Sequence, residues 1–167
     1  MKSPLPPSSG LEISITYNVD RQKLRFSSLG AKTATQTFID HLPKNDLAYY
    51  IKYDEDDENK IQGVFWTYPW CQMMWKRFPE VLGLDNTYKT NRFNMYLFQV
   101  TGVTDQKSLA NFAFSLINNE KEEGFQWLCN CLDELRRKLE APAPCVVVTD
   151  REQALKNALG RVFPFVQ

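Results

Sequence analysis

The sequence predicts an α/β fold whose second half follows the order β-β-β-α-β-α. Residues 81–117 contain three apolar runs separated by short polar segments, which is typical of an antiparallel meander. Residues 118–140 then carry apolar side chains at helical spacing. Residues 145–149 are a nearly unbroken run of valines, and such a run is typical of a strand buried on both faces beside a parallel neighbour. A crossover helix therefore returns the chain to a parallel strand.

An α+β extension over residues 11–80 is expected to precede this core. Its expected elements are a short helix, a β-hairpin and an apolar helix, at residues 33–43, 47–53 with 61–67, and 69–79. Pro69 suits the first helical turn, since proline lacks the N–H that a helix start leaves unpaired. The acidic run at residues 54–58 is interpreted as a solvated hairpin loop, because the glycine spacing of an EF-hand calcium loop is absent. Residues 1–10 are rich in proline and serine and are expected to be disordered.

The elements of the core, over residues 81–167, follow from the same spacing argument. The expected strands are residues 81–85, 95–103, 109–117 and 145–149, and the expected helices are residues 118–140 and 151–161. Asn118 and Asn119 offer a cap for the first of these helices, and Pro142 and Pro144 end it.

Several aromatic and sulfur-containing residues invite a functional interpretation. Trp66, Trp70 and Trp75 could form a base-stacking platform, but their hairpin and helical spacing favours packing. The four cysteines are isolated or lie on one helix where their side chains diverge, so a zinc site is not favoured. We interpret them as reduced thiols that fill the core, at positions 71, 129, 131 and 145.

The charge balance restricts how this chain could hold nucleic acid. Its 20 basic and 20 acidic residues cancel, and no basic stripe stands out. DNA affinity is therefore expected to come from a local arrangement, from bound cations or from protein beyond Gln167. We expect an intracellular protein without a membrane segment, because no signal-peptide layout and no bilayer-length apolar stretch are present. A small-molecule substrate is not expected.

Two aspartates lie at the ends of expected strands. Asp85 closes the apolar run of residues 81–85, and Asp150 follows the valine-rich strand. If those strands are neighbours, both carboxylates enter one crevice, and their mutual repulsion favours a bound cation. Magnesium binds through a few carboxylate oxygens, waters and substrate phosphate. The alternative is structural, with Asp85 forming a turn before Asn86 and Asp150 capping the next helix.

Two segments carry a family resemblance. Residues 81–93 read VLGLDNTYKTNRF, and residues 146–159 read VVVTDREQALKNAL. Both resemble motifs of Mutator-like element (MULE) transposases, the group with the FAR-RED-impaired-response relatives of plants. The resemblance extends over residues 45–165.

The resemblance implies a DDE-type, DNA-cutting nuclease with a ribonuclease-H-like core that acts on transposon ends in the nucleus. Asp85 and Asp150 match the first and second catalytic, metal-binding acids of that family, which uses Mg²⁺ or Mn²⁺. Lys89 and Arg92 lie within the first motif and could contact a phosphate near the metals, although each could equally be a solvated side chain beside a turn.

The family's third acid, usually a glutamate, lies well downstream of the second, and only 17 residues follow Asp150 here. Glu152 is too close in sequence to serve. Three acids at the start of the crossover helix are weaker candidates, because carboxylates are favourable at any helix start, at positions 120, 122 and 123.

We therefore expect the amino-terminal part of a transposase, truncated before its last elements and inactive as this chain. The alternative is a non-catalytic, transposon-derived module that associates with DNA or with proteins. An incomplete sheet would leave an apolar edge at its fourth strand, so self-association is also expected.

Overall fold

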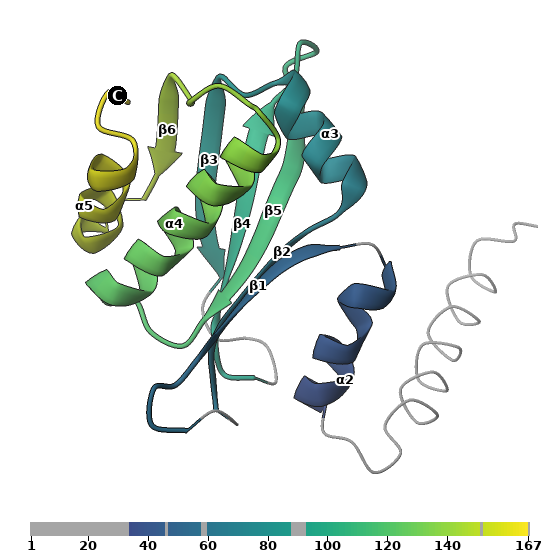
Figure 1. The fold of residues 1–167 in the computed structure, drawn as a ribbon. Coiled ribbons are helices and arrows are strands. Elements are labelled where there is room, and N and C mark those ends of the chain that lie inside the picture. The colour runs from purple at the N-terminus through teal and green to yellow at the C-terminus, as the bar shows by residue number, and fades with distance from the viewer. Residues whose placement is uncertain (1–33, 46, 58–59, 88–92, 151, 167) are drawn as a thin grey trace, which may run out of the picture. The chain divides into compact units, whose positions relative to one another are not determined.

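The computed structural model describes residues 34–45, 47–57, 60–87, 93–150 and 152–166 (Figure 1). The chain divides into two compact units, residues 1–41 and 42–167, each considered by itself. In the first unit the described segment is the helix α2 (Ala34–His41), which confirms the short helix expected there. The expected disorder of residues 1–10 lies outside the described residues.

The described residues of the second unit form a six-stranded mixed sheet and three α-helices. Its elements are η1 (Pro43–Asn45), β1 (Ala48–Tyr53), β2 (Ile61–Thr67), α3 (Pro69–Arg77), β3 (Val81–Thr87), β4 (Tyr96–Val103), β5 (Leu109–Ile117), α4 (Glu122–Lys138), β6 (Val146–Thr149) and α5 (Gln153–Val162). The predicted order β-β-β-α-β-α is confirmed from β3 onward, and so are the hairpin and the helix that begins at Pro69.

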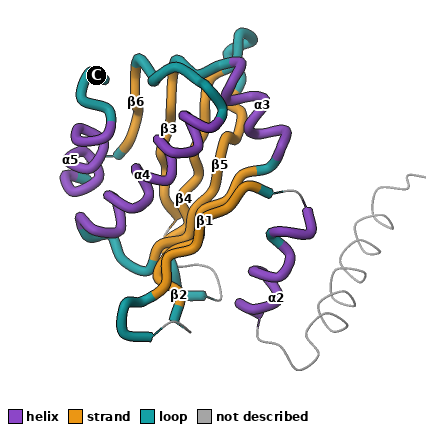
Figure 2. The backbone as a smooth tube through the Cα atoms, in the orientation of Figure 1, coloured by secondary structure: helices purple, strands orange, loops and turns teal. Residues whose placement is uncertain are grey.

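The strands lie in the order β1-β2-β5-β4-β3-β6 (Figure 2). β3, β4 and β5 form the antiparallel meander, and β6 pairs parallel to β3 after the α4 crossover. The β1–β2 hairpin joins the same sheet because β2 pairs antiparallel with the second half of β5. The first and fourth strands of the predicted core are therefore direct neighbours.

Aromatic contacts fix two helices on the sheet. Trp75 of α3 is fully buried and stacks on Phe112 of β5, with ring centroids 5.8 Å apart. Phe125 of α4 meets the ring of Phe98 of β4 edge-on at 5.7 Å. Burying rings of this size dominates core energetics. The packing interpretation holds for Trp75, whereas the side chain of Trp70 is 55% exposed.

The prediction that β6 is buried on both faces is wrong for the described residues. Val146 and Val148 are 38% and 59% exposed, and only Val147 packs against the core cluster from this run. β6 ends the sheet, with β3 as its strand partner in the described part of the chain. A groove of about 510 Å³ lies between β6 and α5 and is lined in part by Phe163.

The expected cap of α4 is also corrected. Lys121, rather than Asn118 or Asn119, occupies the N-cap position and makes no side-chain cap hydrogen bond. Asn119 instead stabilises the turn just before α4, because its Oδ1 accepts from the backbone N–H of Lys121 at 3.0 Å. Asparagine oxygens form such local turns as readily as caps, so the sequence alone could not distinguish the two.

The cysteines divide into two groups. Cys129 and Cys131 lie buried on α4, and burial raises the pKa of each thiol to about 12, as expected for core residues. Cys71 is half-buried and Cys145 is exposed, so the prediction that all four thiols fill the core is wrong for Cys145.

Residues 55–57, in the described part of the acidic loop, are exposed as predicted, but Asp54, its first residue, forms a hydrogen-bond network. Asp54 Oδ2 accepts from Lys60 Nζ at 2.9 Å and from Gln62 Nε2 at 2.8 Å, while Oδ1 accepts from the Asp56 amide at 3.1 Å. The Lys60 hydrogen bond is the largest cause that lowers the pKa of Asp54 to about 2. This network closes the loop between β1 and β2.

Asp54 is expected to make stability depend on acid pH. A carboxyl group whose pKa is lower in the folded state stabilises the fold above its unfolded pKa, and this stabilisation is lost as pH falls toward the folded value. Asp54→Asn should therefore lower the urea midpoint at pH 6, and the difference from wild type should shrink progressively as pH falls from about 4 through 2. Glu55→Gln, at an exposed position of the same loop, is the control. A difference that does not shrink over this range would show that charge is not the cause.

Candidate metal centre at the carboxyl ends of β3 and β6

Side chains along β3 alternate between the two faces of the sheet, and this alternation places Asp85. Leu82 and Leu84 are buried at 0% and 3% exposure, so the intervening residues and Asp85 point to the opposite face. Asp85 is exposed and lies opposite Gln99 of β4 in the antiparallel ladder. The Asp85 carboxylate therefore stands in solvent near the carboxyl end of β3.

Asp150 is brought beside it by the parallel register of β6. Leu84 pairs with Thr149, so the next residues along the two strands are Asp85 and Asp150. Both carboxylates are exposed, and both stand at the same end of neighbouring parallel strands, although 65 positions separate them in sequence. In sheets of this kind ligands bind outside the carboxyl ends of such strands.

The structure also shows a local role for one oxygen of Asp150. Its Oδ1 accepts from the backbone N–H of Glu152 at 3.2 Å and lies 3.5 Å from the hydroxyl of Thr149. The N-cap of α5 is Glu152 rather than Asp150, and the helix begins at Gln153. Oδ2 of Asp150 makes no hydrogen bond to the described part of the chain, so this oxygen remains free for a ligand.

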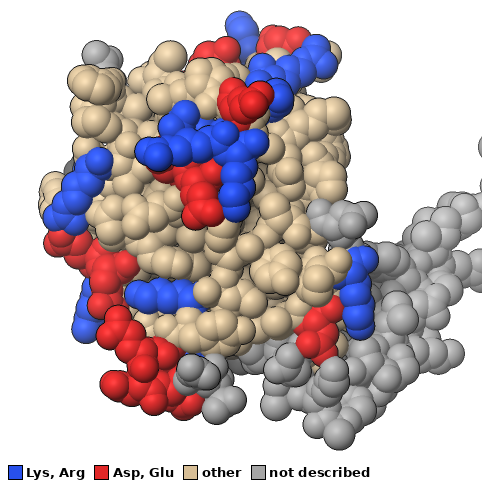
Figure 3. All heavy atoms as spheres, in the orientation of Figure 1, with Lys and Arg blue, Asp and Glu red and all other residues tan. Residues whose placement is uncertain are grey.

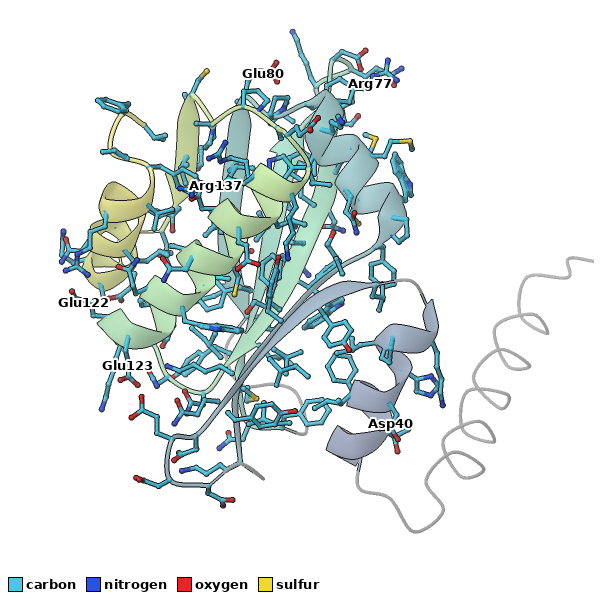
Figure 4. All side chains as sticks on the ribbon, viewed as in Figure 1. Asp40, Arg77, Glu80, Glu122, Glu123 and Arg137 are labelled. Carbon is cyan, nitrogen blue, oxygen red and sulfur yellow. The ribbon has the colours of Figure 1, made fainter. Side chains whose placement is uncertain are left out.

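Neither aspartate forms an ion pair with a described lysine or arginine, in contrast to Asp133, which Arg136 and Arg137 both reach at 2.7 Å. Acidic side chains also gather near this end of the sheet, where Glu122 and Glu123 begin α4 (Figures 3 and 4). Two adjacent carboxylates without a described cationic partner favour a bound cation, and they match the one or two carboxylates that Mg²⁺ takes from protein.

The three glutamates considered as a third acid already have partners. Asn86 Nδ2 donates to Glu120 Oε1 at 2.6 Å, which ties the end of β3 to the start of α4. Glu122 pairs with Arg161 of α5, and Glu123 accepts from Asn119 at 3.3 Å. Within the ranges that the structure describes, no three His, Cys, Asp or Glu residues form a metal-binding group.

The remaining predicted site residues lie in the segment between β3 and β4. Lys89 and Arg92, expected to contact phosphate, fall at residues 88–92, outside the described residues. The described geometry is thus a pair of carboxylates with one free edge of the sheet beside it.

Residues 81–167, more than half of the chain, match the MULE transposase domain family. The chain belongs to this family. The matched segment begins with β3 and includes both aspartates, as the resemblance of residues 81–93 and 146–159 indicated. The MULE domain here therefore covers the meander, the crossover helix, β6 with Asp150 directly after it, and α5.

Curated relatives of the FAR-RED-impaired-response type agree with this assignment. Protein FAR1-RELATED SEQUENCE 5 of Arabidopsis thaliana is 27% identical over 77% of this chain and 16% of its own length. Protein FAR-RED IMPAIRED RESPONSE 1 of the same plant is 20% identical over 92% of this chain and 18% of its own length. A segment of the PKS-NRPS hybrid synthetase cheA of Chaetomium globosum is 32% identical over 89% of this chain and 3% of that protein.

The MULE-domain chain spans between 3% and 22% of the length of the curated relatives it matches. No solved structure matches it significantly. In the described part of the chain, no helix has the length and apolarity needed to cross a membrane.

Proposed function

We propose that this MULE domain supplies the first two metal-binding acids, Asp85 and Asp150, of a DDE-type transposase with a ribonuclease-H-like core. The observation that carries the proposal is the parallel β3–β6 register, which aligns the two aspartates of the family motifs at one end of the sheet. The substrate would be the DNA of transposon ends, and the protein would act in the nucleus.

Each of the two aspartates would supply a metal ligand from its own place in the sheet. Asp85, on a strand paired on both sides, would supply one oxygen ligand, and the free Oδ2 of Asp150 would supply the second. Bound Mg²⁺ or Mn²⁺ would supply charge stabilisation and an activated water for phosphodiester cleavage. The Asn86–Glu120 hydrogen bond would hold the end of β3 in place from the opposite face. A further acid would come from outside the described residues.

A second candidate function is a non-catalytic module, derived from a transposon, that associates with DNA or with proteins. It is favoured by one observation, namely that no three His, Cys, Asp or Glu residues among those described form a metal-binding group. The exposed edge of β6 and its groove support the expected self-association of such a module.

Manganese binding separates the two candidates. Mn²⁺ titrated into the protein should lose its free-ion electron paramagnetic resonance signal, and Asp85→Asn or Asp150→Asn should weaken binding at least roughly tenfold, since even the loss of an outer-shell partner costs that much. Asp105→Asn is the matched control, because Asp105 is an exposed aspartate in the β4–β5 turn at the other end of the sheet. Equal binding by wild type and the Asp85 variant would overturn the metal role and leave the non-catalytic module.

A further inference from the structure

The face of the sheet that carries Asp85 also carries Gln99 of β4. The antiparallel β3–β4 register places Gln99 directly opposite Asp85. Side chains of directly opposed residues stand on the same face, with Cβ atoms about 4.5–5.5 Å apart. The neighbours of Gln99 along β4, Phe98 and Val100, are buried on the other face, where Phe98 meets Phe125 of α4 (Figure 1). Gln99 therefore lies beside Asp85 on the face away from α4.

The side-chain amide of Gln99 is available to a ligand. Gln99 is half-buried, and its side chain makes no hydrogen bond to the described part of the chain. Thr101, the next polar residue on this face of β4, is occupied instead, because its hydroxyl donates to the Gly83 carbonyl at 3.4 Å. On its other side Gln99 lies opposite Phe114 of β5, whose ring accepts no conventional hydrogen bond. The two N–H donors and the accepting oxygen of the amide therefore have their polar neighbour on the Asp85 side.

A phosphate group is the ligand that fits between Gln99 and the aspartates. Glutamine is one of the side chains that hydrogen-bond phosphate oxygens in DNA complexes. Divalent ions such as Mg²⁺ bind substrate phosphate together with one or two protein carboxylates, so a phosphodiester oxygen would come to the Asp85 side of Gln99. The amide is uncharged, and it therefore adds nothing to the repulsion between the phosphate and the two carboxylates.

We propose that Gln99 is a substrate-binding residue of this site, and that its side-chain N–H donates to a non-bridging oxygen of the DNA phosphodiester. The proposal rests on the proposed function, because the phosphate is brought there by a metal ion at Asp85 and Asp150. A contact to phosphate carries no sequence information. Gln99 would therefore position a DNA strand over Asp85 whatever its base sequence.

Oligonucleotide binding in the presence of Mn²⁺ tests the proposal. The full 167-residue chain is titrated into a fluorescein-labelled twelve-nucleotide oligothymidine at saturating Mn²⁺ and low ionic strength, since salt weakens phosphate contacts, and anisotropy is recorded. Gln99→Ala should bind at least roughly tenfold more weakly than wild type, because it loses a hydrogen bond to a charged group. Mn²⁺ binding without DNA, measured by electron paramagnetic resonance, should be unchanged in Gln99→Ala.

Gln106→Ala is the matched control for the same chemical change. Gln106 is exposed in the turn between β4 and β5, at the other end of the sheet from Asp85. This variant should bind both Mn²⁺ and the oligonucleotide as wild type does.

Gln99→Glu distinguishes a place beside the metal from a merely structural role. The substitution preserves the size of the side chain and adds a carboxylate opposite Asp85. Mn²⁺ binding should tighten at least roughly threefold, because affinity depends on the number of charged ligands, while oligonucleotide binding should weaken by repulsion. Reduced stability alone would not move the two affinities in opposite directions. Unchanged Mn²⁺ affinity in Gln99→Glu would overturn the proposal, since Gln99 would then lie out of reach of the ion.

The remaining outcomes separate this proposal from the proposed function. If Mn²⁺ binding depends on Asp85 but Gln99→Ala binds the oligonucleotide as wild type does, or wild type binds none, the Gln99 contact is wrong and the metal role of Asp85 stands. If Mn²⁺ binding does not depend on Asp85, the proposed function is wrong and the Gln99 contact with it. A loss in Gln99→Ala with oligoadenylate but not with oligothymidine would overturn the phosphate contact in favour of a base contact, because glutamine pairs with the edge of adenine.

Discussion

Gly102→Ala should destabilise the protein by about 3 kcal/mol, the upper end of what overpacking a core costs. A Cβ built at Gly102 lies 2.0 Å from Cζ and 2.1 Å from Cε2 of Phe112. Phe112 cannot retreat, because its ring is fully buried and stacked on Trp75 at an interplanar angle of 6°. The measurement is urea unfolding at neutral pH, followed by tryptophan fluorescence.

Gly160→Ala is the matched control for the same chemical change. Gly160 is exposed in α5, and a Cβ there meets nothing within 4 Å, so alanine should stabilise the helix by about 0.5–1 kcal/mol. Phe112→Leu combined with Gly102→Ala should recover part of the lost free energy of unfolding. Leucine is smaller than phenylalanine and leaves room for the Cβ of the alanine. If Gly102→Ala and Gly160→Ala have equal free energies of unfolding, the close approach of Gly102 and Phe112 does not destabilise Gly102→Ala.

The order and types of the elements could be predicted because each depends on local spacing. The apolar run 109–117 matched β5 at both ends, and Pro69 marked the start of α3. The exposure of β6 could not be predicted in this way. A run of valines shows that a strand suits burial, but whether another element covers it depends on its place in the sheet, and Val148 lies on the last strand.

The candidate site, too, could be predicted from the sequence only in part. Asp85 and Asp150 were recognised from strand ends and motifs, and their alignment followed once the crossover was assumed parallel. The hydrogen bond from Asn86 to Glu120 has no signal in the sequence, because it joins side chains 34 positions apart on two elements. A groove of about 860 Å³ between α3 and the start of β5 was missed for a similar reason, since it lies where β2 stops short of the start of β5.

Ala158→Arg should detach α5 locally while the meander stays folded. Ala158 is fully buried on the face of α5 that carries Leu155 and packs against α4. Burying an unpaired guanidinium there would cost about 3 kcal/mol or more, so undocking the helix is the cheaper response. The undocked segment would include β6, whose four residues pair with β3 alone in the described sheet.

Hydrogen exchange followed by mass spectrometry measures this result. Backbone amides of β6 and α5 should lose protection in Ala158→Arg, while those of β4 and β5 keep theirs. Asn157→Arg, at the exposed neighbouring position, should leave every segment protected as in wild type. Equal loss of protection across β4 and β5 would contradict local detachment and show that α5 unfolds together with the core.

The same variant connects packing to the proposed function. Asp150 lies between β6 and α5, so its position depends on the docking of α5, whereas Asp85 lies on a strand paired on both sides. Ala158→Arg should therefore weaken Mn²⁺ binding although Ala158 is not a proposed ligand, and Asn157→Arg should not. Unchanged Mn²⁺ binding in a variant whose β6 has lost protection would mean that Asp150 is not a ligand, because a carboxylate on a mobile segment cannot hold a fixed site.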